Sequence, residues 1–382
     1  MTRLINHRVL AVFAIVALPL LSVAGLLAFG AGESRLRSAY GQELTNIAEL
    51  ITGATDAYVY RRIIDASNLA RIPTIRAAAA EASRRPFDEG AALALDKEWQ
   101  SSRNLSSALT AVLQNEASRF LADLAARDAI HREILVTDRQ GRLIAASNRT
   151  SDFYQADEEW WQEAFDNGGR GRVFVSGVLY DESARVKAID IAASIANADE
   201  SQVVGVIKVI VDIRELAAIV EGMRLGETGS AALVREDGSL VLAPPGADTR
   251  FFATDQLRER IEIKRQGAES LYQLHFSARA ADGMARLVGV APSQLGASYP
   301  NLSWVVAVSQ TESERFGPLR TQASWLLVVL AISGLVVLLL AVIFSARLAA
   351  PPIPENMHLS THPAVHRLDE PGASRAESTG RV

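Results

Sequence analysis

The stretch ILVTDRQGRLIAAS, from Ile134 to Ser147, decides the fold of this 382-residue chain. Its apolar residues lie on both sides of a charged segment that contains Gly141, a pattern that predicts two antiparallel strands joined by a turn. The hydrophobic period of two indicates strands with one face toward a core. We therefore expect a β-sheet to begin near residue 131.

A second stretch, SAALVREDGSLVLAP (230–244), repeats this pattern with one residue fewer at the turn. Both copies contain Leu-Val, a charged turn with glycine, and two apolar residues. Each copy is followed later by a long apolar strand that ends just before a helix. We interpret the two copies as an internal repeat of one supersecondary unit.

Further strands are predicted after each hairpin. Those of the first unit are GGRGRVFVSGVLYD (168–181), VKAIDIAASI (186–195) and QVVGVIKVIVDI (202–213), and those of the second are SLYQLHFSA (270–278), RLVGVAPS (286–293) and LSWVVAVSQ (302–310). Between the first hairpin and its strands, residues 148–167 predict a loop and a short helix. Five antiparallel strands with a helical insertion indicate a PAS-like α+β module. The predicted modules are residues 128–222 and 223–315.

The residues before the first hairpin have a helical period. Apolar residues recur every three to four positions from Glu33 to Arg85, with Pro73 permitting a break, and a second helix is predicted over 91–127. A helix of about fifty residues cannot bury itself alone. We expect residues 31–127 to form stalk and dimerisation helices that pack on a domain, on a second copy of the chain or on both, and we expect a homodimer through residues 33–85 and the membrane helices.

Two segments without charged residues flank this region, Val9–Phe29 and Ala323–Ala346. Each is long enough to cross ~30 Å of hydrocarbon as a helix. Basic residues precede the first segment and follow the second, which places both chain ends in the cytoplasm. The prediction is a multi-pass inner-membrane protein with membrane helices at 9–30 and 323–346, and with residues 31–322 in the periplasm.

The chain ends outside the two membrane helices are short. Residues 1–8 are predicted to be a cytoplasmic N-terminus, and residues 347–382 a polar, disordered cytoplasmic tail. For the first apolar segment the alternative is a cleaved signal peptide, although its apolar run exceeds the ~7–15 residues usual for one.

Composition and motifs argue against several kinds of chemistry. The net charge of −5 does not favour a nucleic-acid partner, and the absence of cysteine excludes disulfides and thiolate metal sites. The chain has no P-loop, nucleophile elbow or HExxH motif, so no enzyme activity, cofactor or metal is predicted. His358, His362 and His366 would share one face of a helix, but Pro363 favours disorder there.

The sequence DEEWW, Asp157 to Trp161, places two of the five tryptophans side by side. Neighbouring side chains on a helix diverge by about 100°, so both rings cannot enter one core in the ordinary way, and at least one should face a second layer, a partner or a ligand. An indole face attracts a cation by roughly 0.5–2 kcal/mol, and a buried carboxylate adds a charge-assisted bond. We expect an amine or another small polar organic ligand to bind among Tyr154, Glu158, Trp160, Trp161, Tyr180, Asp181, Asp190 and Asp212.

Structural roles remain open for the same residues. The acids of DEEWW also suit the N-terminus of a helix, and Tyr180-Asp181 also suits a strand end. Asp190 and Asp212 lie in apolar strands, where a charge needs a partner or solvent. Arg149, Arg185 and Lys187 are the predicted partners of these two carboxylates.

The order of these features resembles the double-Cache sensor domains of bacterial chemoreceptors, histidine kinases and cyclase-type receptors. The resemblance rests on the membrane segments, the long first helix, ILVTDRQGRLIAAS with NRTSDFYQADEEWWQEAF, VLYDES, VVGVIKVIVDI and GETGSAALVREDGSLV, over about residues 33–315. It implies an extracytoplasmic receptor that binds a small ligand in its membrane-distal module, 128–222. The membrane-proximal module, 223–315, and the second membrane helix would relay the signal.

The resemblance also implies site residues. In amino-acid-binding members an aromatic pair matches Trp160 and Trp161, a tyrosine matches Tyr180, and the aspartate that holds the ligand amine matches Asp212. The arginine that holds the ligand carboxylate is replaced here by Glu158. A carboxylate repels another carboxylate, so this departure argues against the same mode of amino-acid binding.

No output domain follows the second membrane segment in this sequence. The chain is therefore expected to be a truncated receptor or a sensor that signals through a separate cytoplasmic partner. The alternative is a non-signalling envelope protein that captures solutes or scaffolds a complex, and an envelope hydrolase is a weaker alternative.

Overall fold

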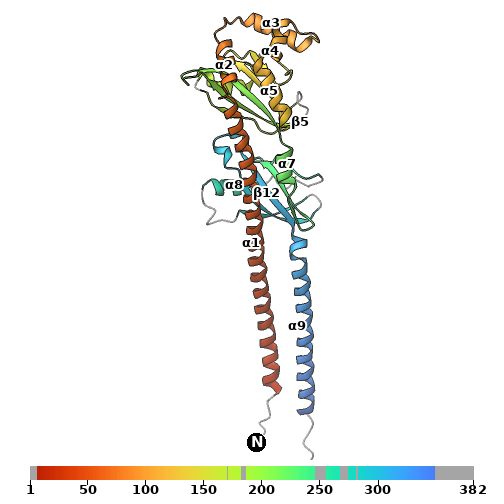
Figure 1. The fold of residues 1–382 in the computed structure, drawn as a ribbon. Helices are drawn as coiled ribbons and strands as arrows, with labels where there is room; N and C mark the ends of the chain where they lie inside the picture. Colours follow the sequence, from red (N-terminus) through yellow and green to blue (C-terminus); the bar gives the residue numbers. More distant parts are fainter. Residues whose placement is uncertain are drawn as a thin grey trace, which may run out of the picture. The chain divides into compact units, whose positions relative to one another are not determined.

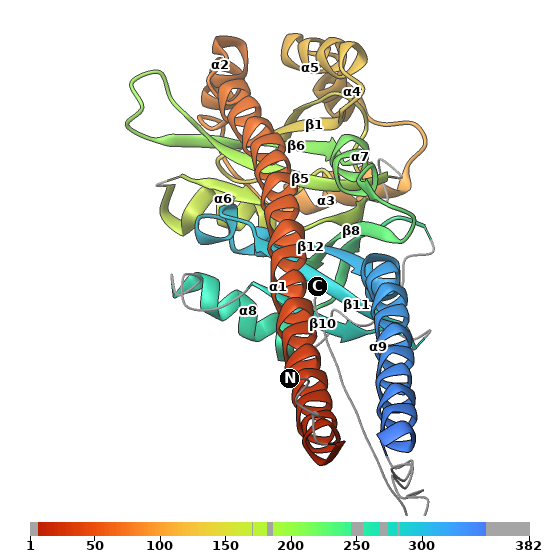
Figure 2. The ribbon, with the colours of Figure 1, turned by 90° about the horizontal axis from the view of Figure 1, so that it is seen from below.

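The computed structural model describes residues 7–169, 171–181, 186–245, 255–266, 274–280 and 283–348. Two antiparallel sheets of six strands each lie beside one long helix, α1 (His7–Leu69), as Figures 1 and 2 show. Both sheets belong to one compact unit, Ala24–Leu327. The predicted α+β class, with a long N-terminal helix and two tandem sheet modules, is confirmed.

The first sheet has the strand order β2-β1-β6-β5-β3, and β4 also pairs with β5. Its strands are β1 (His131–Asp138), β2 (Leu143–Ala146), β3 (Val173–Val175), β4 (Leu179–Asp181), β5 (Val186–Ala196) and β6 (Val203–Asp212). The prediction of one strand over 168–181 is wrong. Ser176 interrupts it, because its hydroxyl accepts the N–H of Asp190 at 2.8 Å and donates to the carbonyl of Gly177 at 2.8 Å.

The second sheet has the order β10-β11-β12-β8-β7, and β9 also pairs with β8. Its strands are β7 (Arg224–Leu225), β8 (Gly229–Arg235), β9 (Leu240–Leu242), β10 (His275–Arg279), β11 (Ala285–Pro292) and β12 (Trp304–Thr311). The hairpin β8–β9 takes the place of β1–β2, and β12 that of β6. The repeat predicted from the two hairpin sequences is therefore confirmed. Residues 270–273 of a predicted strand lie outside the described residues.

The single helix predicted over 91–127 is wrong. Three helices occupy this segment: α3 (Glu89–Ser101), α4 (Ser107–Gln114) and α5 (Glu116–Arg127). Polar side chains start new helices within the apolar pattern. The side chain of Asp88 caps α3, and that of Asn115 caps α5 by accepting the N–H of Ser118 at 2.8 Å. The break expected at Pro73 is present, since α2 (Pro73–Ala82) begins there.

Helix α1 packs on both sheets. Its residues Leu44, Ile51 and Ile63 are buried, as their periodic spacing predicts. The Thr52 hydroxyl donates to the carbonyl of Ala291 in the second sheet at 3.1 Å, and Tyr58 donates to that of Asp212 in the first at 3.3 Å. The helix thus connects the two modules directly.

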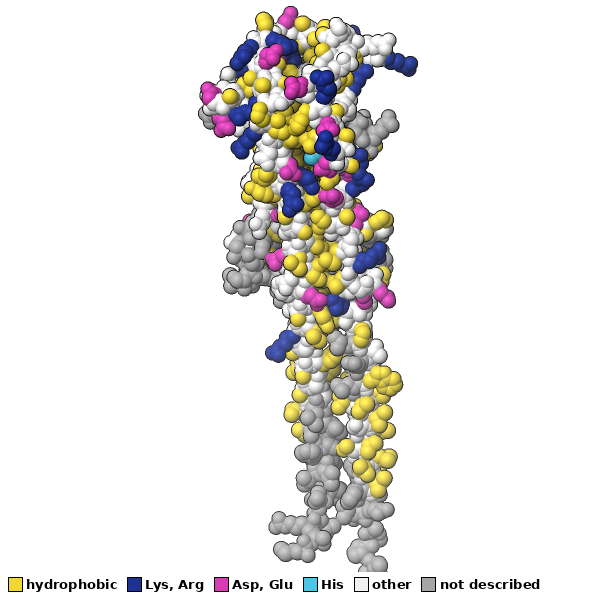
Figure 3. All heavy atoms as spheres, viewed as in Figure 1, with side chains coloured by type: hydrophobic (Ala, Val, Ile, Leu, Met, Phe, Trp, Pro, Cys, Tyr) yellow, Lys and Arg dark blue, Asp and Glu magenta, His cyan; other side chains and the backbone are white. Residues whose placement is uncertain are grey.

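Helix α9 (Glu312–Leu348) follows β12 without an intervening loop. Of the helices in the described part of the chain, one is long and apolar enough to cross a membrane, over Glu312–Leu340. Most of its exposed side chains beyond Val328 are hydrophobic (Figure 3). The first predicted membrane helix forms the beginning of α1 and stays a prediction. The tail with His358, His362 and His366 lies outside the described residues.

Three short helices and two 3-10 turns complete the described elements. Helix α6 (Glu159–Gly169) packs on the first sheet, α7 (Arg214–Glu221) connects the modules, and α8 (Asp255–Arg265) packs on the second sheet. The turns η2 (Leu295–Ala297) and η3 (Pro300–Leu302) precede β12. The first module's sheet and α6, together with η3, border the candidate site.

Candidate ligand-binding site

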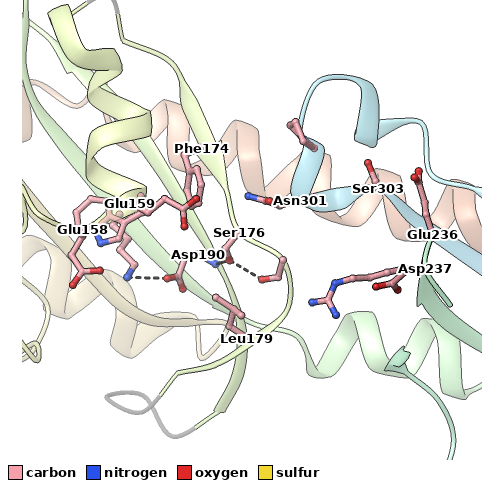
Figure 4. A pocket seen from close by; sticks show the side chains of 15 residues that line it. Glu158, Glu159, Phe174, Ser176, Leu179, Asp190, Glu236, Asp237, Asn301 and Ser303 are labelled. Carbon is pink, nitrogen blue, oxygen red and sulfur yellow. Dashed lines mark hydrogen bonds and ion pairs between the residues drawn. The ribbon is translucent and has the colours of Figure 1, made fainter. Parts of the chain in front are cut away.

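A cavity of about 580 Å³ lies where the first module meets the second (Figure 4). On one side it is bordered by α6, β3, β5 and β6 of the first module. On the other side are the β8–β9 turn and the η3–β12 segment of the second module. Its volume is in the range of small-molecule sites in proteins. Fifteen residues line it, including Glu158, Trp160 and Asp190 of the predicted set.

An ion pair forms part of the cavity wall. The ammonium of Lys208 on β6 lies 2.9 Å from a carboxylate oxygen of Asp190 on β5, and both side chains are largely buried. Ser176, also buried, fixes the backbone of Asp190. The pair balances two charges that would be unfavourable if they were buried alone.

The two tryptophans have different surroundings, although both belong to one hydrophobic cluster. The ring of Trp161 stacks on Phe165 with centroids 4.7 Å apart, and its N–H donates to the Thr137 hydroxyl at 2.9 Å. Trp160 borders the cavity, and the Lys208 ammonium lies 5.1 Å from its ring centroid. The same cluster contains Trp99 of α3 and Phe153, so Trp161 is enclosed by apolar side chains while Trp160 also faces the cavity.

Glu158 precedes α6 and lines the cavity. Its carbonyl accepts the N–H groups of Trp161 and Gln162, both at 3.1 Å, which starts the helix. Burial raises the pKa of its carboxyl; the charge of Lys208 opposes this rise, and the charges of Asp157, Asp152 and Asp190 add to it. A positive charge next to Glu158 would therefore be stabilised.

The second module contributes polar groups to the opposite wall. Arg235 ends β8, and Glu236 and Asp237 lie in the turn that follows it. Asn301 lies in η3, and Ser303 lies between η3 and β12. The amide of Asn301 donates to the carbonyl of Val175 in the first module at 3.2 Å. The cavity is thus formed jointly by two modules that are hydrogen-bonded to each other.

The other predicted site residues lie elsewhere. Tyr180 is 63% exposed and does not line the cavity, and Tyr154 stacks on Phe87 with centroids 6.4 Å apart. Asp212 is buried and accepts hydrogen bonds from the guanidinium groups of Arg132 and Arg214. The backbone of Asp181 ends β4, and its side chain lies outside the described residues. The described side chains of Tyr154, Tyr180 and Asp212 therefore do not line the cavity.

The partners predicted for the two aspartates differ from those observed. Lys208 pairs with Asp190, while Arg132 and Arg214 pair with Asp212. Of the predicted partners, Arg149 instead donates to the carbonyl of Ser102 at 2.9 Å. Lys187 is exposed, and Arg185 lies outside the described residues.

Lys208 and Arg235 are the two basic residues of the cavity lining, and neither belongs to the predicted set. A signal for Lys208 was present, because it is the one charged residue within VVGVIKVIV (203–211), an otherwise apolar strand. Arg235 stands at the end of the repeated Leu-Val pair, where the pattern indicates an exposed turn. Within the described residues, no group of three or more potential ligands could hold a metal ion.

The solved structures that match this chain include ligand-binding domains of chemoreceptors. One is that of the Pseudomonas aeruginosa PAO1 amino acid chemoreceptor PctB in complex with L-Arg, with 14% identity, coverage of 72% of this chain and 97% of that one, and a TM-score of 0.41. That of Pseudomonas fluorescens CtaA in complex with L-isoleucine has 16% identity, coverage of 75% and 98%, and a TM-score of 0.43. That of P. aeruginosa PAO1 PctC with GABA has 15% identity, coverage of 71% and 99%, and a TM-score of 0.43.

The family assignment rests on the chain's own sequence. None of the curated proteins matches it significantly. The family model described as Cache domain matches residues 33–319. This range includes both sheets and the part of α1 that follows its apolar beginning. Because this match covers most of the chain and the two sheets repeat one strand order, the protein belongs to the Cache domain family, with a double-Cache arrangement.

Proposed function

We propose that this protein is an extracytoplasmic sensor that binds a small organic ligand with an ammonium group in the cavity between its modules. The observation that carries the proposal is the charge of the lining. Five lining residues are acidic, Glu158, Glu159, Asp190, Glu236 and Asp237, whereas two are basic, Lys208 and Arg235. Lys208 is already paired with Asp190. A positively charged ligand group would therefore be stabilised by the remaining carboxylates at α6, those of Glu158 and Glu159.

The ligand ammonium is assigned to Glu158 and Glu159 rather than to an aromatic cage. Lys208 lies over the Trp160 ring, and Trp161 is engaged with Phe165 and Thr137. Glu158 supports the assignment, because burial and three neighbouring carboxylates raise its pKa. A charge-assisted hydrogen bond with an ammonium would contribute about 1.5–3 kcal/mol.

Signalling would proceed through the helices that border the membrane. Family membership and the apolar part of α9 support a periplasmic position for residues 31–322, with both helix ends leading to the cytoplasm. A ligand can shift a receptor only by its differential affinity for two conformations. A cavity with walls from both modules provides such a difference, because its shape depends on how the modules meet. A separate cytoplasmic partner would then detect the change in α9.

A homodimer through α1 is part of this proposal. Leu50 is 73% exposed on α1, and Tyr60 and Ile64 are also exposed on the same helix. A second copy would cover these side chains. The chain contains no cysteine, so a Leu50→Cys variant should form an intermolecular disulfide in membranes, whereas Leu240→Cys on β9 should not. Equal cross-linking of both variants, or of neither, would contradict a dimer through α1.

Calorimetry on the full chain in lipid nanodiscs tests the ligand class. Primary and quaternary amines are compared with carboxylates of the same carbon skeleton. We expect amines to bind, with at least tenfold weaker binding to Glu158→Gln and unchanged binding to Glu259→Gln, whose glutamate is exposed on α8. Binding of carboxylates alone, or of no amine, contradicts the proposal.

A further inference from the structure

The wall that faces Glu158 across the cavity belongs to the second module. Figure 4 shows Glu158, Glu159 and Asp190 on one side, and Asn301, Ser303, Glu236 and Asp237 on the other. Ser176 and Leu179 lie between the two groups in this view. A ligand that occupies the length of the cavity would therefore contact both modules.

Arg235 brings a guanidinium to this second wall. A Cβ atom on Gly177 of the first module would lie 3.6 Å from an Nη atom of Arg235, so the guanidinium reaches the boundary between the modules. Its hydrogen bond to the Ser239 hydroxyl is long, at 3.5 Å. A guanidinium has five N–H donors in a planar fork that suits a carboxylate. The hydrogen bond to Ser239 uses one N–H group of the Arg235 guanidinium, so other N–H groups can donate to a ligand.

The neighbouring acid does not engage these donors through a close ion pair. The carboxylate of Asp237 accepts the backbone N–H of Ser239 at 2.8 Å, inside the tight β8–β9 turn. Hydrogen bonds from Ser239 are also the main cause of the lowered pKa of Asp237, and Arg235 contributes less. The turn thus stabilises its own carboxylate and presents the guanidinium to the cavity.

From this geometry we infer that Arg235 binds an anionic group of the ligand and thereby determines specificity. The inference rests on the proposed function, in which Glu158 holds the ammonium. The ligand class is then an aminocarboxylate whose two charges lie at opposite ends of a chain and touch different modules. An amine without the anion would occupy the first wall only.

The position of Arg235 in the sheet connects this contact to the membrane helix. Arg235 lies opposite Trp304 in the β8–β12 pairing, and β12 leads directly into α9 at Glu312. An anion held by Arg235 therefore acts on the strand beside the one that carries α9. The ammonium end of the ligand, in contrast, contacts the first module, whose strands do not lead into α9.

Three five-carbon probes that differ in one end group test the inference: 5-aminopentanoate, 5-aminopentan-1-ol and cadaverine. Calorimetry is performed on the full chain in nanodiscs, with wild type, Arg235→Gln, Arg235→Glu and the control Arg224→Gln. Arg224 is exposed on β7 and does not line the cavity. Wild type and the control should bind 5-aminopentanoate about tenfold to hundredfold more tightly than the amino alcohol.

The variants should change this preference in a defined way. Arg235→Gln should bind the two probes with similar affinity, while its affinity for the amino alcohol stays at the wild-type value. Arg235→Glu should prefer cadaverine over 5-aminopentanoate. Equal binding of 5-aminopentanoate and the amino alcohol to wild type, or an unchanged preference in Arg235→Gln, overturns the role of Arg235 but leaves the proposed function standing. Binding of none of the probes to wild type overturns both.

Discussion

The ammonium of Lys208 and the carboxylate of Asp190 lie 2.9 Å apart on adjacent strands of the first sheet, and Lys208 also lies over Trp160. These three residues form one interacting group in the cavity wall. The indole face that a ligand cation would contact is therefore occupied by a side chain of the protein itself. In the proposed function, the ligand ammonium would bind beside this group, at Glu158, or would displace Lys208.

The Lys208–Asp190 pair should be coupled in stability. Lys208→Met leaves Asp190 without its partner, and Asp190→Asn leaves Lys208 without its counter-charge. Each change should lower the unfolding free energy by about 2 kcal/mol. The double variant should be less destabilised than the sum, with a coupling energy of about 1–2 kcal/mol. Thermal unfolding followed by tryptophan fluorescence measures this, and strict additivity would show that the pair is not coupled.

Amine binding should depend on the ionisation of Glu158. Burial raises the pKa of this carboxyl, with added effects of neighbouring acids, and an ammonium ligand pairs with the ionised form. Affinity should therefore be highest above the raised pKa and decrease as the pH falls through it. Calorimetry with 5-aminopentan-1-ol from about pH 7.5 to about pH 4.5 measures the effect. The affinity of Glu158→Gln for the same amine should not decrease over this pH range. An equal decrease in wild type and in Glu158→Gln would show that Glu158 is not the cause.

Asp212 should be a structural residue and not a ligand contact. Burial opposes its ionisation, but the N–H of Arg214 and the guanidinium groups of Arg132 and Arg214 lower its pKa overall. Asp212→Asn should reduce the unfolding free energy by about 2–3 kcal/mol at neutral pH, with unchanged ligand affinity. The lowered pKa means that this contribution is complete above the usual value of about 3.9 and is lost as the pH falls through the lower folded value. A large loss of affinity with intact stability would instead place Asp212 in the site.

His275 should make the second module sensitive to mild acid. A Cβ atom on Gly41 of α1 would overlap its ring, so helix and ring are in close contact. Burial, with the charge of Arg260, lowers the pKa of His275, so the folded state favours the neutral ring. Stability should therefore decrease as the pH falls below the unfolded value of about 6.5, until the folded pKa is passed.

Unfolding measured from about pH 7.5 to about pH 5 tests this expectation. His275→Phe should flatten the decrease, because it keeps a ring but cannot ionise. His131 is buried with a lowered pKa as well, and His131→Phe is the matched comparison. An unchanged pH profile in His275→Phe would show that the decrease has another origin.

The fold could be predicted from the sequence to the extent that it depends on periodicity. The two Leu-Val hairpins and the long α1 have recognisable apolar periods, whereas the long strands β6 and β12 stand out as nearly continuous apolar runs. The helical region 91–127 was predicted as one helix because its apolar spacing continues. Its division depends on polar side chains that override the periodicity locally: the Glu98 carboxylate accepts the N–H of Ser106 at 2.6 Å between α3 and α4, and Asn115 caps α5.

The site could be predicted only in part. Glu158, Trp160 and Asp190 come from sequence segments with unusual composition, and the fold brings them to one cavity. Arg235 comes from the other module, and its contribution depends on how two domains pack, which a local pattern does not contain. Asp212 matched a family position, but Arg132 and Arg214 neutralise it here.

The most direct test of the account is to fill the cavity without changing its charges. Gly177 lies in the lining, and the Cβ atom of an alanine there would make ordinary contacts at 3.6 Å, so Gly177→Ala should keep ligand binding. Gly177→Phe should fold but block the site. With 5-aminopentan-1-ol at a hundredfold excess over its dissociation constant for wild type, wild type and Gly177→Ala should gain about 2.7 kcal/mol in unfolding free energy, and Gly177→Phe nearly none. An equal gain in folded Gly177→Phe would place the ligand elsewhere and contradict the account.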